Sequence, residues 1–276
     1  MRISFYGKSS VGKTFIVSNL AVGLQKRGFK VLLIGCDTKQ DSSLSILKKY
    51  IPSVFDIMNQ KINMELKIDD FIHEGYNRVH SLESGTPPAG IGCGGYIFGE
   101  TIKMLRDFGK LESYDFYLYD VPGDLVCGGY SSPLQYSDIA YVITDNDFNS
   151  IYSLNRVVEG IYTKSKAYDV KLGGLISNRC NYVNKIELIS SILNLELLGG
   201  ISDNVDFREE KLGFHTVYEM FDKTKRYKEV VHEFEHIIDN ILKQLSRKDK
   251  IKNPKPLEIN ELNERFRNQH VVQGME

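Results

Sequence analysis

A short glycine-rich segment near the start of the chain has the spacing of a phosphate-binding loop. Residues 7 to 14 read GKSSVGKT, which matches G-x-x-x-x-G-K-[ST] between an apolar run and a helical pattern. In such a loop, backbone N–H groups and the N-terminus of the following helix point at phosphate oxygens. We expect Lys13 to reach the β- and γ-phosphates of a nucleotide and Thr14 to place its hydroxyl on Mg²⁺. The alternative is a chance glycine turn, and the strand and helix on either side argue against it.

Acidic residues follow two further apolar runs. Asp120 ends the run FYLYD and takes the place of a Walker B aspartate, which holds Mg²⁺ through water. Asp124 lies in the next loop, where it could sense a γ-phosphate. Asp37, Lys39 and Asp41 follow the run VLLIG, in the position of a first switch loop. Asp37 and Asp124 are the candidates for orienting the attacking water, and each could instead be a cap or turn residue.

Two of the four cysteines are flanked by glycines. Cys93 lies in GIGCGG and Cys127 in DLVCGG, three residues beyond Asp124. Glycines let backbone N–H groups approach the sulfurs of an iron–sulfur cluster. Two thiolates cannot complete a Cys₄ site, but a twofold dimer brings the same two from each subunit to one axis. Burial as a structural thiol is the common alternative, and we expect it for Cys36 and Cys180.

The pattern of apolar residues predicts the elements that must position these side chains. Short apolar runs alternate with longer amphipathic ones, which indicates an α/β fold with a mostly parallel sheet flanked by helices. We expect strands at 3–6, 30–35, 116–119, 140–144, 172–176 and 195–201, and helices at 13–27, 100–111, 149–166, 184–194 and 225–246. The candidate residues then lie beyond the carboxyl ends of strands, where ligands bind in open sheets. We expect one P-loop domain over residues 1–246 and a C-terminal tail over 247–276.

Composition argues against several classes of protein. The formal net charge of -1 gives no global positive field for nucleic acid. The sequence has no apolar stretch of roughly 20 residues that could span a bilayer, and no apolar signal segment at the N-terminus. Four cysteines in 276 residues are too sparse for a disulfide scaffold. We therefore expect a soluble protein in a reducing compartment, without a nucleic-acid partner or membrane insertion.

Five segments together resemble the nitrogenase iron-protein family over residues 1 to about 220. They are GKSSVGKT, GCDTKQDSS, PPAGIGCGGYIFGETIKML, YDVPGDLVCGGYSSPL and VKLGGLISNR. Lys8, a second lysine early in the loop, resembles the signature lysine of the deviant Walker A ATPases, which reaches across a dimer to the partner's nucleotide. The match is nearest to the branch that serves light-independent (dark-operative) protochlorophyllide reductase. Tyr96 replaces an arginine usual in nitrogenase iron proteins, and the PPAG run, YVITDNDF and the tail KPLEINELNERF resemble that branch.

The resemblance implies a homodimer that binds two MgATP and one bridging [4Fe–4S] cluster, with Cys93 and Cys127 as cluster ligands and Thr14 on Mg²⁺. ATP binding would close the dimer and move the segment 120–127, which is a population shift between two geometries. The residues it assigns to catalysis are Lys8, Lys13, Asp37, Asp120 and Asp124. Those it assigns to ATP contacts are Ser10, Val11, Gly12, Lys13, Thr14, Phe15, Lys39, Asn178 and Arg179.

The resemblance also implies partners and a cellular role. The dimer would dock on a separate catalytic N/B-type heterotetramer, which reduces the C17=C18 bond of protochlorophyllide in chlorophyll biosynthesis. Ferredoxin would refill the cluster. The location would be the chloroplast stroma in a eukaryote and the cytoplasm in a bacterium.

Four positions depart from the family pattern. Ser9 and Ser10 replace paired glycines, and a positive φ at either would cost about 1 kcal/mol or more. Thr38 replaces a proline after the switch aspartate. Pro122 replaces a leucine, which fixes φ and removes an N–H inside the segment expected to move.

Two other functions remain open from the sequence. One is an electron donor for nitrogenase, chlorophyllide reductase or another tetrapyrrole enzyme. The other is a ParA- or MinD-like positioning ATPase, which would share Lys8, Lys13 and Asp120 but would have no need for the two glycine-flanked cysteines.

Overall fold

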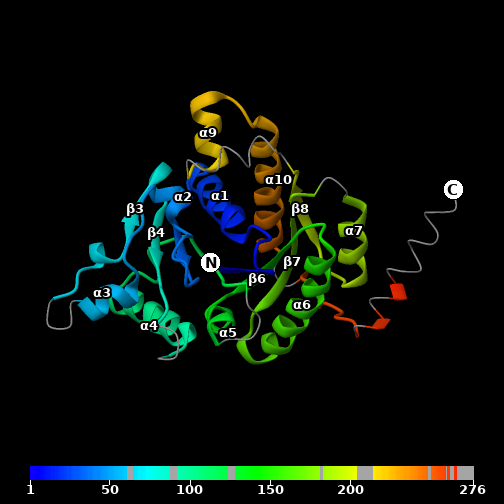
Figure 1. Cartoon of the computed structure of the whole chain (residues 1–276), viewed down its shortest axis with the longest axis horizontal. Helices are drawn as coiled ribbons and strands as arrows, with labels where there is room; N and C mark the ends of the chain where they lie inside the picture. Colours follow the sequence, from blue (N-terminus) through cyan, green and yellow to red (C-terminus); the bar gives the residue numbers. More distant parts are fainter. Residues whose placement is uncertain are drawn as a thin grey trace.

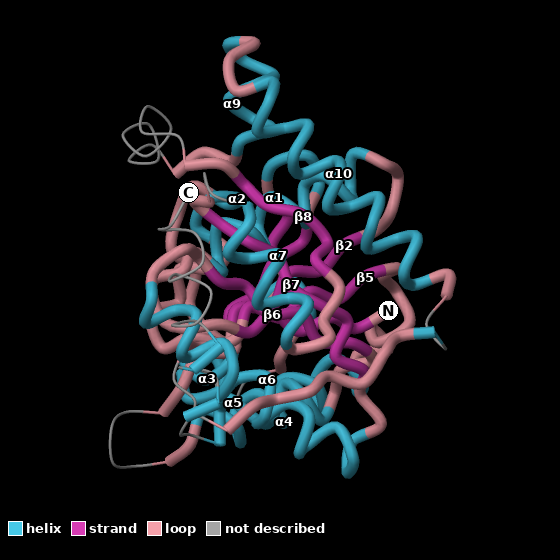
Figure 2. The backbone as a smooth tube through the Cα atoms, turned by 90° about the vertical axis from the view of Figure 1, so that its right-hand side faces the viewer, coloured by secondary structure: helices cyan, strands magenta, loops and turns pink. Residues whose placement is uncertain are grey.

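The described residues fold into one eight-stranded sheet between two layers of helices (Figure 1). The structure is a computed structural model that describes residues 1–60, 65–87, 92–123, 128–180, 183–203, 214–247, 250–258, 260–261 and 264–265. Seen at right angles to the first view, the strands run through the middle of the molecule with helices on both sides (Figure 2). The predicted fold class, a mostly parallel sheet flanked by helices, is confirmed.

The strand order brings the phosphate loop to the centre of the sheet. The strands are β1 (Arg2–Tyr6), β2 (Val31–Gly35), β3 (His73–Glu74), β4 (His80–Glu83), β5 (Phe116–Asp120), β6 (Ile139–Thr144), β7 (Lys171–Asn178) and β8 (Leu197–Ile201). Their order is β3-β4-β2-β5-β1-β6-β7-β8, and every pairing is parallel except that of β3 with β4. Because β5 and β6 flank β1, the loops that follow these three strands lie side by side.

Helices cover both faces of the sheet. They are α1 (Lys13–Lys26), α2 (Leu44–Leu47), α3 (Val54–Gln60), α4 (Gly94–Asp107), α5 (Gly128–Gln135), α6 (Phe148–Tyr168), α7 (Val183–Ile192), α9 (Val217–Thr224) and α10 (Lys228–Leu245). Figure 1 shows α1, α9 and α10 above the sheet and α4, α5 and α6 below it. Two single 3₁₀ turns precede β3 and β4.

Alternating side chains of the strands build one core on each face. In β2, Val31 and Leu33 pack into the cluster under α1 and α10, while Leu32 and Ile34 pack into the cluster over α4 and α6. All four are at most 1% exposed. Burying a side chain of this size stabilises the fold by about 2 kcal/mol. Coverage of both faces is the reason why β2 reads as a continuous apolar run.

Most of the predicted elements are confirmed, and the differences have local causes. The helix predicted at 100–111 begins at Gly94, directly after Cys93. The helix predicted at 225–246 begins only at Lys228, because Lys225 and Tyr227 have φ of 60° and 62° and separate it from α9. The prediction omits β4, since its sequence HSLE lacks the apolar character by which the other parallel strands are recognised.

Residues 250–258 lie against the domain although the sequence places them in a tail. Asn155 of α6 accepts from the Leu257 N–H at 2.9 Å and donates to its carbonyl at 2.7 Å. Asn194 donates to the Asn253 carbonyl at 2.8 Å. The boundary between a domain of residues 1–246 and a tail of 247–276 stays a prediction.

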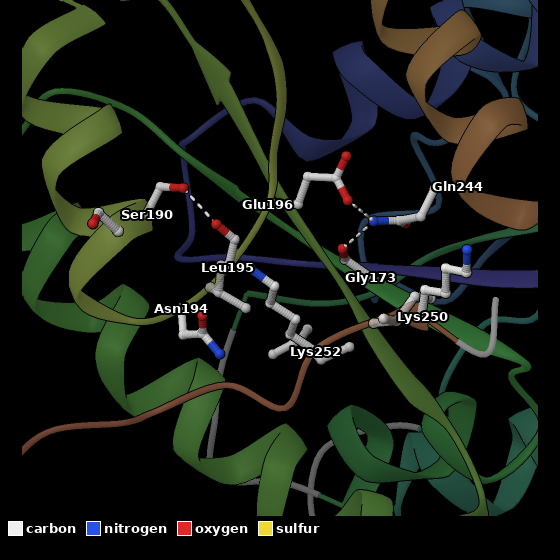
Figure 3. Close-up of a pocket in the computed structure, with 11 residues that line it drawn as sticks. Gly173, Ser190, Asn194, Leu195, Glu196, Gln244, Lys250 and Lys252 are labelled. Atoms are coloured by element: carbon white, nitrogen blue, oxygen red, sulfur yellow. Dashed lines mark hydrogen bonds between the residues drawn. The ribbon is translucent and has the colours of Figure 1, made fainter. Parts of the chain in front are cut away.

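A cavity of about 350 Å³ opens where this segment passes α7 and the start of β7 (Figure 3). Several of its polar side chains make hydrogen bonds within the fold. Gln244 donates to the Gly173 carbonyl and to Glu196, each at 2.7 Å, and Ser190 donates to the Leu195 carbonyl at 2.6 Å. The cavity lies at the amino end of β7, whereas the phosphate loop follows the carboxyl end of β1.

A buried carboxyl group ends β4. Glu83 is 1% exposed, and its Oε1 accepts from the Ser43 N–H at 2.7 Å and the Ser43 hydroxyl at 2.6 Å. Its Oε2 has no hydrogen-bond partner among the described residues. Burial raises the pKa of Glu83 to about 7; the bonds from Ser43 oppose this shift, and the charges of Asp120 and Asp41 add to it.

We predict that Glu83 makes stability depend on pH. Because its pKa is raised from 4.5 to about 7, the folded protein keeps a proton that the unfolded chain releases, so stability falls as pH rises through this window. Glu83→Gln cannot ionise. The free energy of unfolding of Glu83→Gln, relative to the wild type, should therefore rise by about 2 kcal/mol between about pH 5 and pH 8.

Urea titrations at both pH values measure this difference. Glu159→Gln, at an exposed position of α6, is the matched control. A difference between Glu83→Gln and the wild type that does not change with pH would contradict the prediction.

Candidate functional site

The phosphate loop is held closed by its own lysine. Lys13 is 7% exposed, and its Nζ donates to the carbonyls of Gly7 and Lys8, each at 3.1 Å. Gly12 caps α1 with φ 88° and no side-chain bond, so the N–H groups of the first helical turn face the loop. A Cβ at Gly12 would collide with the Asn178 amide. The arrangement is that of an anion site at a helix N-terminus.

The two serines that replace the family's paired glycines differ in their backbone geometry. Ser10 has φ 72°, in the left-handed region, and Ser9 does not have a positive φ. The strain expected for a side chain in this loop therefore falls on Ser10. A Cβ at Gly123 would lie 2.5 Å from the Ser9 nitrogen, so the segment after β5 passes directly over the loop.

The two residues predicted to serve Mg²⁺ touch each other. The Thr14 hydroxyl donates to Asp120 Oδ2 at 2.6 Å, and the Ser42 hydroxyl donates to the same oxygen at 2.7 Å. Asp120 is 2% exposed. Burial raises the pKa of its carboxyl, although the hydroxyl bonds and the charge of Lys13 oppose the rise. Carboxylate and hydroxyl oxygens are ligands that suit Mg²⁺.

The first switch loop is folded as a turn. Asp37 accepts from the Thr38 hydroxyl and from the Lys39 N–H, each at 3.1 Å, and its own carbonyl accepts from the Gln40 N–H at 3.2 Å. The Lys39 side chain is exposed, and Asp41 is half-buried. The Asp37 carboxylate therefore stabilises a turn in this structure, and its role in orienting the attacking water stays a prediction.

Asn178 and Arg179, at the end of β7, both bind carbonyls of the phosphate loop. The Asn178 amide donates to the Val11 carbonyl at 2.7 Å, and its Oδ1 is buried without a partner among the described residues. The Arg179 guanidinium donates to the Ser10 carbonyl at 2.7 Å and to Asp145 Oδ2 at 2.6 Å. These two predicted ATP-contact residues thus position the loop directly.

Two further predicted residues lie at the margins of the loop. The Lys8 ammonium is 3.7 Å from Asp147 Oδ1, which caps α6. The Phe15 ring packs edge-on against Phe234 of α10, with the ring centres 5.6 Å apart. Phe15 therefore contributes its ring to the core.

Cys93 is an exposed thiol that caps α4. Its sulfur accepts from the Gly95 N–H at 3.4 Å. The flanking glycines also have a packing reason, because a Cβ at Gly94 would lie 2.6 Å from the Thr86 methyl. Tyr96 is 67% exposed beside it. The helix N-terminus favours a negatively charged ligand such as a thiolate.

The other three cysteines differ from Cys93 in exposure or lie outside the described residues. Cys36 and Cys180 are buried, as predicted, and burial raises the pKa of both thiols, that of Cys180 to about 11. Cys127 and Asp124 lie outside the described residues. Within the described part of the chain, no group of three or more His, Cys, Asp or Glu could hold a metal ion. Cys93 fits a cluster ligand by chemistry and exposure, and the other ligands must come from elsewhere.

Sequence reasoning missed four polar residues of this region. Ser42 and Asp145 bind the predicted residues Asp120 and Arg179, and Ser43 binds Glu83. Asp145 ends the apolar run YVIT, which was a usable signal. The other three have none, because their hydrogen-bond partners are distant in sequence.

Among the described helices, none is both long enough and apolar enough to cross a membrane.

Solved structures share the fold. The chain is 20% identical to the cell division protein MinD of Aquifex aeolicus, with a TM-score of 0.66, covering 88% of this chain and 96% of that one. The cell division ATPase MinD of Pyrococcus furiosus gives 22% identity and the same TM-score, covering 88% and 98%. At such identities the likeness shows the fold alone.

Curated relatives are much more similar in sequence. A protein from Methylorubrum extorquens is 42% identical over 239 residues, covering 86% of this chain and 80% of the relative. One from Heliobacterium modesticaldum is 40% identical over 248 residues, covering 88% and 86%. Both are named light-independent protochlorophyllide reductase iron-sulfur ATP-binding protein.

A family model for 4Fe-4S iron sulfur cluster binding proteins matches residues 1–272. The family resemblance predicted from the sequence motifs is confirmed. The predicted branch is confirmed too, because the relatives carry the name of the protochlorophyllide reductase component. The chain belongs to the NifH/frxC family of 4Fe-4S iron sulfur cluster binding proteins.

Proposed function

We propose that this chain is the ATP-driven electron donor of a light-independent protochlorophyllide reductase. The observation that carries the proposal is the exposed Cys93 thiol at the N-terminus of α4, in a chain that also has a complete phosphate loop. A positioning ATPase of the same fold has no need for such a thiol. The name of the curated relatives supports the choice of acceptor.

ATP is the substrate of the central site. Lys13 exchanges its bonds to loop carbonyls for phosphate oxygens, and the first turn of α1 donates its N–H groups. Thr14 holds Mg²⁺ directly, and Asp120 holds it through water. Lys8 is only weakly held by Asp147, so it is available to reach the nucleotide of a second subunit.

The iron–sulfur site is shared between two copies of the chain. Cys93 and Cys127 of each subunit supply the four thiolates of one [4Fe–4S] cluster. When bound, the cluster supplies one-electron transfer chemistry. The dimer takes electrons from ferredoxin and docks on an N/B-type catalytic heterotetramer. These assemblies act in the chloroplast stroma or, in a bacterium, in the cytoplasm.

The segment after β5 connects nucleotide and cysteine. It follows Asp120, passes the phosphate loop where Gly123 meets Ser9, and continues along the sequence to Cys127. Nucleotide contacts bias this segment between two positions. Pro122 restricts φ in it, which narrows the positions that it can adopt.

We predict that anaerobically purified protein contains about four iron and four sulfide ions per dimer. Cys93→Ser should lose both, because serine does not replace a thiolate ligand to iron. Cys180→Ala, at a buried position, is the matched control and should keep both. Chemical iron and sulfide analysis measures this.

Iron-free wild-type protein that still dimerises with MgATP would favour a positioning ATPase. Iron-loaded protein that supports only the catalytic partner of nitrogenase, in reconstituted reductase assays, would overturn the proposed acceptor.

We predict opposite effects of Asp120→Asn on stability and on nucleotide binding. Burial raises the pKa of Asp120, so its charge costs folding free energy, and asparagine keeps an acceptor for the two hydroxyls. The melting temperature of nucleotide-free protein should rise, while Mg²⁺-dependent ATP affinity should fall about tenfold or more. Thermal melts and calorimetric titrations measure the two effects.

Ser42→Ala is the control, because it removes a donor and leaves the charge, and it should lower the melting temperature. A lower melting temperature for Asp120→Asn would contradict the prediction.

We predict that Ser10→Gly is more stable than Ser9→Gly by about 1 kcal/mol. Both changes add the same freedom to the unfolded chain, but only Ser10 has a left-handed backbone that glycine relieves. Urea unfolding of the nucleotide-free proteins gives the comparison. Equal stabilities would show that φ at residue 10 carries no strain.

A further inference from the structure

Two adjacent serines join the loop after β2 to acids on two different strands. Ser42 donates to Asp120 at the end of β5, and Ser43 donates twice to Glu83 at the end of β4. All four residues are at most 2% exposed. Buried hydrogen bonds of this kind cost free energy to break. Because the two serines are adjacent in the chain, a displacement of one also displaces the other and the acid bound to it.

Ser84, the residue directly after β4, contacts the helix whose N-cap is the exposed Cys93 thiol. The Thr101 hydroxyl of α4 donates to the Ile97 carbonyl at 2.9 Å, which uses its single proton. The Ser84 hydroxyl therefore donates to Thr101 Oγ1, at 2.9 Å in a buried contact. Ser84 is also fixed by its own N–H, which donates to the Gly35 carbonyl at 2.8 Å. Cys93 is the N-cap of helix α4.

Glu83 occupies a position that stability alone does not favour. Its Oε2 lies over Gly35, where a Cβ would collide with it, and has no partner among the described residues. A buried polar atom without a partner costs free energy and calls for an explanation. The bonds to Ser43 through Oε1 supply one, because they tie the switch loop to β4.

We propose that Glu83 is a positioning residue that links the loop 37–43, beside the Mg²⁺ aspartate, to helix α4 and its Cys93 cap. The link runs through Ser43, Glu83, Ser84 and Thr101 and bypasses the segment 120–127. The link rests on the proposed function, because its role is to give the ATP site a second connection to Cys93. Packed elements joined by buried hydrogen bonds move together, which is the physical basis of such a link.

Hydrogen–deuterium exchange of the full-length protein tests the link without any measurement of electron transfer. The probe is Mg²⁺ with the non-hydrolysable analogue β,γ-imido-ATP at saturation. Two groups of amides are followed: the phosphate loop with α1, which reports binding, and the first turns of α4, which report the link. Four variants form two matched pairs, Glu83→Leu with Glu83→Gln, and Thr101→Val with Thr101→Ser.

In the wild type, the nucleotide should slow or speed exchange in α4 by about fivefold or more. Glu83→Leu and Thr101→Val should lose this response while the phosphate loop keeps its protection. Glu83→Gln retains an acceptor for Ser43 and Thr101→Ser retains the hydroxyl, so both should keep the response.

Three results would overturn the proposal. The first is no change in α4 exchange when the wild type binds the nucleotide, and the second is an unchanged α4 response in Glu83→Leu. The third is a variant that loses the α4 response only because its phosphate loop is no longer protected by the nucleotide. Absence of loop protection in the wild type would be a failure of the proposed ATP site itself. Circular dichroism and the exchange of β1 amides show whether each variant is folded.

Discussion

One buried carboxylate oxygen holds the nucleotide site together. Asp120 Oδ2 accepts a hydroxyl from Thr14 at the start of α1 and another from Ser42 in the loop after β2. Taking a charge out of water is costly unless hydrogen bonds replace the lost solvation. The two hydroxyls replace part of it, and they fix a helix, a loop and a strand to one point. The phosphate loop ends there at Thr14, the switch loop passes there at Ser42, and the segment after β5 starts there.

The strand order determines which residues can meet there. β1 lies between β5 and β6, and β2 lies next to β5. In a parallel sheet these four strands end at the same edge, so the loops after them supply the phosphate loop, Asp120, Asp145 and the switch loop. β4, beside β2, adds Glu83 to the same edge. The chemistry therefore follows from topology, as in other open sheets with ligands beyond the strand ends.

Contiguous features were predictable from the sequence and non-local ones were not. Lys13, Thr14 and Asp120 were predicted because their roles depend on a loop geometry coded within a few residues, or on the end of an apolar strand. Ser42 and Glu83 were missed because their bonds join the loop after β2 to strand ends that are close to it only in the fold. The strain at Ser10 was foreseen as one of two possibilities, and only backbone geometry separates it from Ser9. The assignments of Cys127 and Asp124 stay predictions.

Under the proposed function, the start of α4 is the feature that distinguishes this chain from a positioning ATPase of the same fold. Solved MinD structures share the sheet and the helix layers, so the architecture does not distinguish the two functions. The distinction lies in a few residues grafted on the fold. Cys93 caps α4 with a thiol, the helix N-terminus favours a thiolate there, and Gly94 lets the turn pack against Thr86. A helix that begins six residues later, as the sequence pattern alone predicts, would leave Cys93 in a loop without that N-terminus beside it. The element boundary is therefore part of the chemistry of the site.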